Sequence, residues 1–518
     1  MHEVVPNATL SVAAILAEAA KRHPELPAIT LGGASTSYKD LWDQTRAYAG
    51  ALAEAGIGDG DKVAILIPNV TDFARVYYAV LALGAVAVPI HALLKRHEIE
   101  YMLADAEVKM MVCAAPLLGE GAPGAAAAGA TVISVLSSPE DNRFARLEDL
   151  AAAATPIRTY VPRGPLDIAT ILYTSGTTGK PKGALGTHFA LVEQVNVLLM
   201  NTFDMRIGDK IFGGLPLFHT FGQTVALNAG LRAGAEILLL PKFTGEAALS
   251  MLLDEGVNIF IGVPTMYVGL LAAAKERPEP ATALRYAVSG GSALPLAVLE
   301  GFSEHFGAVI HEGYGLTETS PVASFNHVGL EPRPGTVGQA IWGVQIEVAR
   351  PEVSDAIELL ETDELGELVV RGHNLFSGYL NRPEATAEAV VDGWFRTGDL
   401  GTKDTDGYIT IVDRKKDMIL RNGYNVYPRE VEEALFTHPE ITNVAVFGVP
   451  DDTHGQEIVA AVTLAAESLL DAKAIGDYAQ ERLAAYKYPR LIEIVTDFPL
   501  GPSGKILKRE LVTRYAKD

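Results

Sequence analysis

A loop of hydroxyls, glycines and lysines between residues 171 and 183 carries the groups that a phosphate site needs. The segment reads ILYTSGTTGKPKG, an apolar run that ends in Tyr173 and is followed by the loop. Glycines leave backbone N–H groups free to approach an anion, hydroxyls donate hydrogen bonds, and lysines supply compensating charge. The members of this set are Thr174, Ser175, Gly176, Thr177, Thr178, Gly179, Lys180 and Lys182. We therefore expect a phosphate-binding loop.

The loop differs from a Walker A motif. That motif requires Gly-x-x-x-x-Gly-Lys followed by Ser or Thr, and its last hydroxyl binds magnesium. Here the residue five positions before Gly179 is Thr174, and Lys180 is followed by Pro181. Because Ser, Thr and Gly are also ordinary residues of solvent-exposed loops, the segment needs support from the rest of the chain.

The elements around this loop alternate as in an α/β fold. Short apolar runs, such as KVAILIPN at 62–69, alternate with helical stretches, such as 71–84, up to about residue 400. This rhythm predicts largely parallel sheets covered by helices. The Ala/Gly-biased segment 117–132 (LLGEGAPGAAAAGATV) interrupts it, and we predict a surface loop there.

The last hundred residues form a second unit. A strand begins after the turn at Asp406 and Gly407 and ends in the charged run 413–417. A helix opened by Pro428, further strands, another helix and a Gly/Lys tail follow, which is the pattern of a small α+β domain. We predict a large N-terminal domain of layered α/β sheets over 1–414 and a small, mobile C-terminal domain over 415–518.

Charge and cysteine content narrow the class of protein. The 518 residues exceed what one core usually supports, and 64 acidic against 42 basic residues give a net charge of −22, which disfavours nucleic acid. Cys113 is the only cysteine, which excludes an internal disulfide and fits a reducing cytoplasm. The N-terminus is predicted to form an amphipathic helix rather than a signal peptide. No apolar run approaches the roughly 20 residues of a membrane span, so no integral membrane association is expected.

Five stretches of the chain together resemble the adenylate-forming superfamily of acyl-CoA synthetases, peptide-synthetase adenylation domains and firefly-type luciferases. YTSGTTGKPKG at 173–183 is similar to its signature loop. The later motifs follow in the family order: HEGYGLTETSP (311–321), GWFRTGDLG (393–401), DRKKDMILRNGYNVYPREVEE (413–433) and PSGKILKREL (502–511). The resemblance implies two half-reactions. A carboxylate first attacks the α-phosphate of ATP to give an acyl-adenylate, and a thiol, usually that of coenzyme A, then displaces AMP.

The resemblance also implies a site for ATP and Mg²⁺. Lys505 would bridge the carboxylate and the α-phosphate, Tyr314 would lie against adenine, and Asp399, with Arg414 beside it, would accept the ribose hydroxyls. Glu318 would bind magnesium with Thr174 or Thr317, since a hard cation prefers oxygen ligands. The full implied ATP set is Thr174, Ser175, Gly176, Thr177, Thr178, Gly179, Lys182, Gly290, Gly291, Glu312, Gly313, Tyr314, Thr317, Asp399, Arg414 and Lys505.

A hinge and a coenzyme A face follow from the same resemblance. Lys416 matches the pivot about which the small domain rotates between the half-reactions. Rotation would withdraw Lys505 and present the loop RNGYN, in which Gly423, with Tyr424 after it, would line the pantetheine tunnel. His219 resembles a gate between the acid pocket and the thiol entrance, so the implied catalytic residues are Lys505, Thr317 and His219.

The acid pocket is predicted to be large and apolar. Acetate-specific relatives carry a tryptophan where this chain has Gly315, which implies room for a bigger acid. The predicted lining is His219, Phe221, Val263, Tyr267, Gly290, Gly315, Leu316 and Val322, which offers no evident charge for a second carboxylate. The whole sequence resembles bacterial fatty-acid–CoA ligases.

Other functions stay open. Aryl or cinnamoyl acids are the nearest alternative substrates. An adenylate-only ligase would pass the acyl group to an amine or carrier protein, but the extra segment that such ligases usually carry before the hinge is not evident. A protein that kept the fold without the chemistry is disfavoured because Lys505 and Glu318 are both present. A homodimer is compatible with the sequence.

Overall fold

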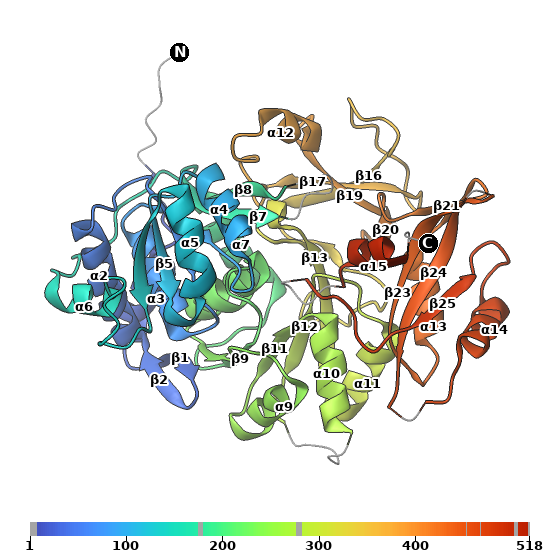
Figure 1. Cartoon of the computed structure of the whole chain (residues 1–518), viewed down its shortest axis with the longest axis horizontal. Coiled ribbons are helices and arrows are strands. Elements are labelled where there is room, and N and C mark those ends of the chain that lie inside the picture. The colour runs from blue at the N-terminus through green and yellow to red at the C-terminus, as the bar shows by residue number, and fades with distance from the viewer. Residues whose placement is uncertain are drawn as a thin grey trace.

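The computed structural model describes residues 8–174, 180–275, 282–451, 453–466, 468–501 and 506–515. The chain forms a large N-terminal part and a smaller C-terminal part, which lies at the orange and red end of the colour range (Figure 1). The α/β class, with a large domain followed by a small one, is therefore confirmed. The boundary at 414/415 and the mobility of the small domain stay predictions.

The first sheet holds the strand before the predicted phosphate loop. Its six strands lie in the order β6-β5-β3-β4-β7-β8. All neighbours are parallel except β7 and β8, which form an antiparallel pair. The strands are β3 (Lys62–Leu66), β4 (Val86–Pro89), β5 (Met110–Ala114), β6 (Thr131–Val135), β7 (Ile168–Thr174) and β8 (Lys182–Thr187). The helices of this region are α3 (Thr71–Ala82), α4 (Arg96–Asp105), α5 (Leu118–Ala128), α6 (Leu147–Ala153) and α7 (His188–Val197).

The second sheet has nine strands in the order β15-β14-β13-β12-β11-β9-β10-β1-β2. Its central pairs are parallel and its two ends are antiparallel. The strands are β1 (Pro27–Leu31), β2 (Ala34–Ser37), β9 (Lys210–Gly213), β10 (Glu236–Leu239), β11 (Ile259–Gly262), β12 (Tyr286–Ser289), β13 (Val309–Gly315), β14 (Val322–Phe325) and β15 (Gln339–Ala340). The helices are α1 (Ala14–Arg22), α2 (Tyr38–Glu54), α8 (Ala229–Ala233), α9 (Gly245–Asp254), α10 (Pro264–Ala274) and α11 (Leu296–Phe306).

A third sheet, of five strands, is antiparallel throughout. It contains β16 (Val344–Ala349), β17 (Gly366–Gly372), β18 (Val390–Val391), β19 (Trp394–Lys403) and β20 (Ile409–Arg414), with helix α12 (Pro383–Ala389) beside it. The prediction of largely parallel strands up to about residue 400 is therefore wrong from residue 344 onward. Short turns, such as the one between β19 and β20, can join only antiparallel strands.

The small C-terminal part has a sheet and cores of its own. Its strands are β21 (Ile419–Arg421), β22 (Tyr424–Val426), β23 (Ile441–Asp451), β24 (Gly455–Leu464) and β25 (Leu491–Ile494), and its helices are α13 (Pro428–Phe436), α14 (Ala472–Arg482) and α15 (Lys508–Tyr515). Buried side chains gather on both faces of this sheet. Phe436 also packs against the core of the large part, so the two parts touch through α13.

The segment predicted as a surface loop, 117–132, is instead helix α5 followed by strand β6. Alanine has the highest helix propensity, which favours a helix even with Pro123 inside it. The glycines allow close packing. A Cβ on Gly121 would lie 2.7 Å from Leu66 Cδ2 and one on Gly124 would lie 2.9 Å from Arg96 O. The composition that imitated a linker is that of a tightly packed helix.

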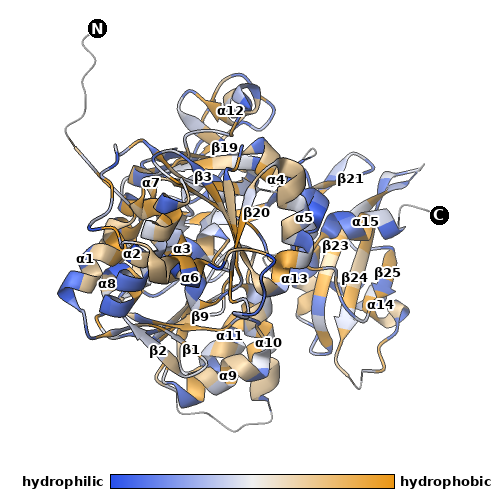
Figure 2. Ribbon diagram, turned by 60° about the vertical axis from the view of Figure 1, so that its left-hand side comes forward, coloured by the Kyte–Doolittle hydropathy of each residue, from blue (hydrophilic) through white to orange (hydrophobic). Residues whose placement is uncertain are grey.

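The predicted amphipathic helix at the N-terminus is confirmed as α1, which buries Ile15 and Leu16. Figure 2 shows the apolar strands of the large part at its centre, with hydrophilic stretches on helices around them. Among the described residues, no helix combines the length and the apolar character that crossing a bilayer requires.

Candidate active site

Strands β12 and β13 bring two of the predicted adenine segments side by side. Ser289 is in register with Glu312, so Gly290 follows next to Gly313 at the carboxyl ends of parallel strands, where α/β sheets commonly bind ligands. A Cβ on Gly290 would lie 3.3 Å from the Phe221 ring and 3.5 Å from Gly313 O. Gly291 has a φ of +88°, a conformation that favours glycine. These glycine positions carry no side chains, so a flat ring could approach the backbone closely here.

Three residues predicted to bind the nucleoside meet in one place. Tyr314, on β13, donates a hydrogen bond of 2.7 Å from its hydroxyl to Asp399 Oδ2, on β19. Arg414, on β20, is in register with Asp399 and places its Nε 3.2 Å from Asp399 Oδ1. Asp399 is 5% exposed, whereas the Arg414 side chain is 48% exposed. A ring, a carboxylate and a cation are therefore assembled from three strands of two sheets.

Glu312 is a buried carboxylate next to this group. It is 6% exposed, and burial raises its pKa to about 7, although the charge of Arg429 opposes the rise. Arg429 belongs to α13 of the small part. The same guanidinium donates a 2.6 Å hydrogen bond to Ile411 O on β20, and the Arg429 N–H donates to Asp413 Oδ2 at 2.9 Å. One arginine thus ties the small part to the strand that carries Arg414.

Glu318, the predicted magnesium ligand, lies in the short helix η4 (Thr317–Thr319) and is 7% exposed. Tyr379 donates a 2.7 Å hydrogen bond from its hydroxyl to Glu318 Oε1. Burial raises the pKa of Glu318, and the Tyr379 bond opposes that rise. The ring of Tyr379 also lies under Lys182, whose Nζ is 5.0 Å from the ring centroid. Lys182 is in register with Thr174, so the base of the phosphate loop reaches Glu318 through Tyr379.

Part of the predicted site lies outside the described residues. This holds for Ser175, Gly176, Thr177, Thr178 and Gly179 of the loop and for Lys505. The described strands β7 and β8 flank the loop on both sides.

The structure describes the residues that were predicted to line the acid pocket. Phe221 begins the π-helical segment η3 (Phe221–Asn228), and its N–H donates a 3.2 Å hydrogen bond to His219 Nδ1. Phe221, Gly290 and Leu316 share one region, since Phe221 contacts Gly290 and packs with Leu316 against the same core. Val322 is paired with Gly315 on β14 and β13. Val263 is buried at the start of α10.

Two residues of that predicted pocket have structural roles that require no substrate. The hydroxyl of Tyr267 donates a 2.7 Å hydrogen bond to Val288 O, and its ring, fully buried, packs edge-on against Phe260 and Phe302. A Cβ on Gly315 would overlap the carbonyl of Pro321. Close backbone approach is therefore a sufficient reason for glycine at 315, and its identity says less about pocket size than the sequence comparison implied.

The predicted hinge and coenzyme A loop are exposed. Lys416 is exposed in the turn after β20. Gly423 has a φ of +78° at the tip of the β21–β22 hairpin, with no atom within 4 Å of a Cβ placed on it. Tyr424 is 57% exposed and stacks on Tyr486 with ring centroids 4.8 Å apart. The hairpin is open to solvent in this arrangement.

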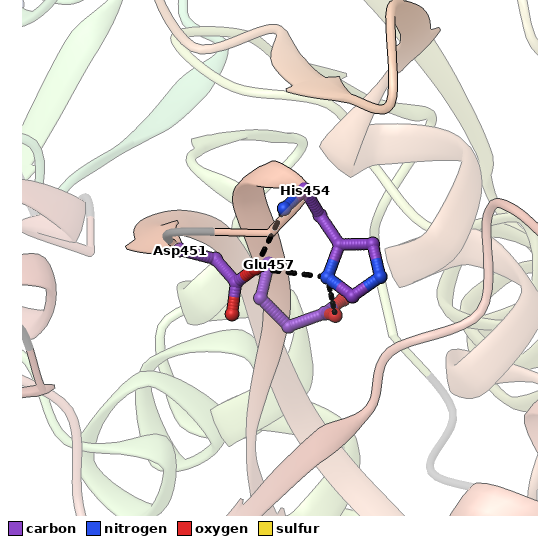
Figure 3. A group of neighbouring side chains, drawn as sticks. All are labelled: Asp451, His454 and Glu457. Atoms are coloured by element: carbon purple, nitrogen blue, oxygen red, sulfur yellow. Dashed lines mark hydrogen bonds and ion pairs between the residues drawn. The ribbon is translucent and has the colours of Figure 1, made fainter.

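A cluster of Asp451, His454 and Glu457 lies near this hairpin (Figure 3). Its ligand-type atoms lie within 4.8 Å of one another. Both Glu457 oxygens already accept hydrogen bonds from Arg421, at 2.7 and 2.9 Å, and Asp451 Oδ1 lies 2.8 Å from His454 Nδ1. A guanidinium thus occupies the position where a cation would bind, and the cluster is an ion-pair network of the hairpin.

Comparison with known proteins agrees with this geometry. Residues 16–380 match the model of the AMP-binding enzyme family, and residues 430–505 match that of the AMP-binding enzyme C-terminal domain. A long-chain-fatty-acid–CoA ligase of Bacillus subtilis (strain 168) is 33% identical over 100% of this chain and 96% of that protein. A feruloyl-CoA synthase of Amycolatopsis sp. is 34% identical over 96% and 97%.

The crystal structure of ATP-bound MatB from Rhodopseudomonas palustris superposes with a TM-score of 0.90 at 32% identity, over 98% of this chain and 99% of that one. The apo form of the same protein gives 0.79 over the same shares. The chain as a whole therefore superposes better on the ATP-bound form than on the apo form.

The chain belongs to the AMP-binding enzyme family. Within it, the protein is an AMP-forming acid–CoA ligase that uses ATP, Mg²⁺ and coenzyme A. The roles of the individual residues stay predictions.

Two residues of this site were not predicted from the sequence. Tyr379 reaches Glu318 from 61 positions away, and no motif quoted above contains it. Arg429 lies within the segment 413–433, but nothing in its spacing indicates the bonds to β20. In both cases the signal is a tertiary contact.

Proposed function

We propose that the protein activates an apolar carboxylic acid, a medium- or long-chain fatty acid, as acyl-AMP and transfers the acyl group to coenzyme A. The observation that carries this proposal is the full-length similarity to a long-chain-fatty-acid–CoA ligase, at 33% identity over the whole chain. The predicted lining, which offers no evident charge for a second carboxylate, supports it, since an apolar wall favours an uncharged substrate chain.

An aryl acid is the second candidate. A feruloyl-CoA synthase has a similar identity and coverage. The two candidates differ in the shape of the acid and share every other step.

The residues of this chain divide the work as follows in this proposal. Asp399 accepts the ribose hydroxyls beside Arg414, Tyr314 lies against adenine, and Glu318 supplies an oxygen ligand with Thr174 or Thr317. Bound Mg²⁺ neutralises charge on the triphosphate. Lys505 neutralises charge between the carboxylate and the α-phosphate. His219 stands between the acid and the thiol entrance, and rotation about Lys416 brings Gly423 and Tyr424 to the coenzyme A side.

The deciding experiment is mass spectrometry of the products from ATP, Mg²⁺ and a panel of acids, each with and without coenzyme A. The panel contains acetate, C6 to C18 fatty acids, benzoate and cinnamates. Acyl-CoA formed from fatty acids is the expected result. Products from cinnamates alone would establish the aryl candidate, and acyl-adenylate that persists with coenzyme A present would contradict both. A cytoplasmic location and a homodimer stay predictions.

A further inference from the structure

Tyr379 joins two predicted parts of the triphosphate site. Its hydroxyl is 2.7 Å from Glu318 Oε1, and its ring faces the Lys182 ammonium at 5.0 Å. We propose that Tyr379 is a positioning residue that holds the Glu318 carboxylate in the orientation needed to bind the Mg²⁺ of bound ATP. This inference rests on the proposed role of Glu318.

A carboxylate as buried as Glu318 needs such a partner. Burial disfavours the charged form, while a hydroxyl that donates to the carboxylate favours it. Glu318 is 7% exposed, and burial is the largest cause of its raised pKa, with the Tyr379 bond as the first opposing cause. A carboxylate has two oxygens, so one can accept from Tyr379 while the other binds a cation.

Both ends of the contact are fixed by backbone bonds. The Tyr379 N–H donates to Thr386 Oγ1 at 2.9 Å, and Tyr379 bridges Ala184 of β8. The Phe376 N–H donates to Glu318 O at 2.9 Å, and the Phe376 ring packs edge-on against Tyr379. The hydroxyl is therefore held in place before any ligand binds, which is the usual function of residues that orient metal ligands.

The contact with Lys182 extends the same support to the phosphate loop. A lysine over an aromatic ring is attracted to its face. Lys182 starts β8, directly after the loop, and is in register with Thr174. Tyr379 thus restrains a cation for the phosphates and an anion for the metal. Substitution by phenylalanine separates these two effects, because it keeps the ring and removes only the hydroxyl.

The test compares Tyr379→Phe, Glu318→Gln and the control Tyr48→Phe with the wild type. Tyr48 donates a 2.8 Å bond from its hydroxyl to Asp72, another buried carboxylate, in the packing of α2 on α3. The readouts are the Mg²⁺ dependence of acid-dependent ATP–pyrophosphate exchange and, without acid, electron paramagnetic resonance titration of Mn²⁺ in the presence of ATP. Thermal melts check that each variant is folded.

Tyr379→Phe is expected to weaken metal binding about 10-fold, as loss of a partner that orients a ligand typically does. The half-saturating acid concentration should change less than about twofold, on the scale of context variation in such effects. Tyr48→Phe should match the wild type in both.

The experiment distinguishes failure of the proposed role of Tyr379 from failure of the proposed role of Glu318. Wild-type metal dependence in Tyr379→Phe, with weakened metal binding in Glu318→Gln, would overturn the role of Tyr379 alone. Unchanged metal binding in Glu318→Gln would show that Glu318 is not a ligand, and the proposed site would fall with the inference.

Discussion

The hydroxyl of Tyr314 lies 2.7 Å from Oδ2 of Asp399, which is 85 positions further along the chain. The bond joins the last strands of the parallel sheet to the antiparallel sheet that leads into the small part. It also occupies one oxygen of a carboxylate that faces Arg414 on its other oxygen. The proposed ribose acceptor is therefore held from both sides without ligand.

Asp399→Asn should raise the KM for ATP. Hydrogen bonds to charged groups contribute about 1.5–3 kcal/mol, which corresponds to roughly 10- to 100-fold in binding. Steady-state kinetics with varied ATP measure the effect. The matched control is Asp209→Asn, another buried carboxylate paired with an arginine, Arg285, at the start of β9. An unchanged KM in Asp399→Asn would remove Asp399 from the nucleotide site.

Glu312 should make the stability of the free protein depend on pH. Burial raises its pKa to about 7, above the usual value near 4.3. A group with a raised pKa in the folded state contributes stability at low pH, and this stability is lost as the pH rises through the folded pKa. Glu312→Gln, which stays neutral, should therefore gain stability relative to the wild type between about pH 4.3 and 7 and keep that gain above.

The measurement is urea unfolding of both proteins at pH 5, 6, 7 and 8. A shift of this size corresponds to at most about 3.7 kcal/mol. A difference between the proteins that is the same at all four pH values would contradict the assignment of the raised pKa to Glu312.

Arg429→Ala should slow adenylation more than thioester formation. The side chain bonds Ile411 O at 2.6 Å across the proposed domain boundary, and the chain superposes better on the ATP-bound relative than on its apo form. Removing a contact made in only one domain orientation shifts the population away from it. Loss of one such bond, about 1 kcal/mol, predicts a roughly fivefold decrease.

ATP–pyrophosphate exchange measures the first half-reaction, and reaction of pre-formed acyl-adenylate with coenzyme A measures the second. The control is Arg482→Ala on α14, whose guanidinium pairs with Glu481 within the small part. Equal slowing of both half-reactions by Arg429→Ala would count against an orientation-specific contact.

Gly423→Leu should block thioester formation and spare adenylation. In the present arrangement a Cβ on Gly423 meets no atom within 4 Å, so any clash must arise in the rotated orientation. The φ of +78° adds strain for leucine, and Gly398→Ala, also at positive φ with open space around it, controls for strain of this type. Both half-reactions are assayed separately, and loss of adenylation in Gly423→Leu would contradict the prediction.

Much of this architecture was predictable because local signals and the global fold agree. The apolar run at 62–69 became β3, the helical stretch 71–84 became α3, and Pro428 opens α13. The failures have physical causes. Helix α5 was missed because its glycines serve helix packing, which composition alone cannot separate from flexibility. The antiparallel sheet from β16 onward was missed because periodicity does not encode strand direction.

The residues of the candidate site also fall into those that a local motif predicts and those that only the folded structure reveals. Asp399 was predicted because its motif is contiguous, and the structure brings it to Tyr314 and Arg414. Tyr379 and Arg429 act through contacts made only after folding. At Gly315 a missing side chain was interpreted as space for a substrate, but close approach of the Pro321 carbonyl is a sufficient reason for the glycine.

Strand β20 ends at Arg414, and β21 begins at Ile419 in a different sheet. Within the described residues the chain passes between the two sheets only there. The small part is thus tethered to the large part by a short connection. A short flexible connection gives a tethered partner an effective concentration on the order of millimolar. In the predicted rotation, each face of the small part would therefore meet the adenylate without a bimolecular search, and the rate at which the faces exchange would not depend on enzyme concentration.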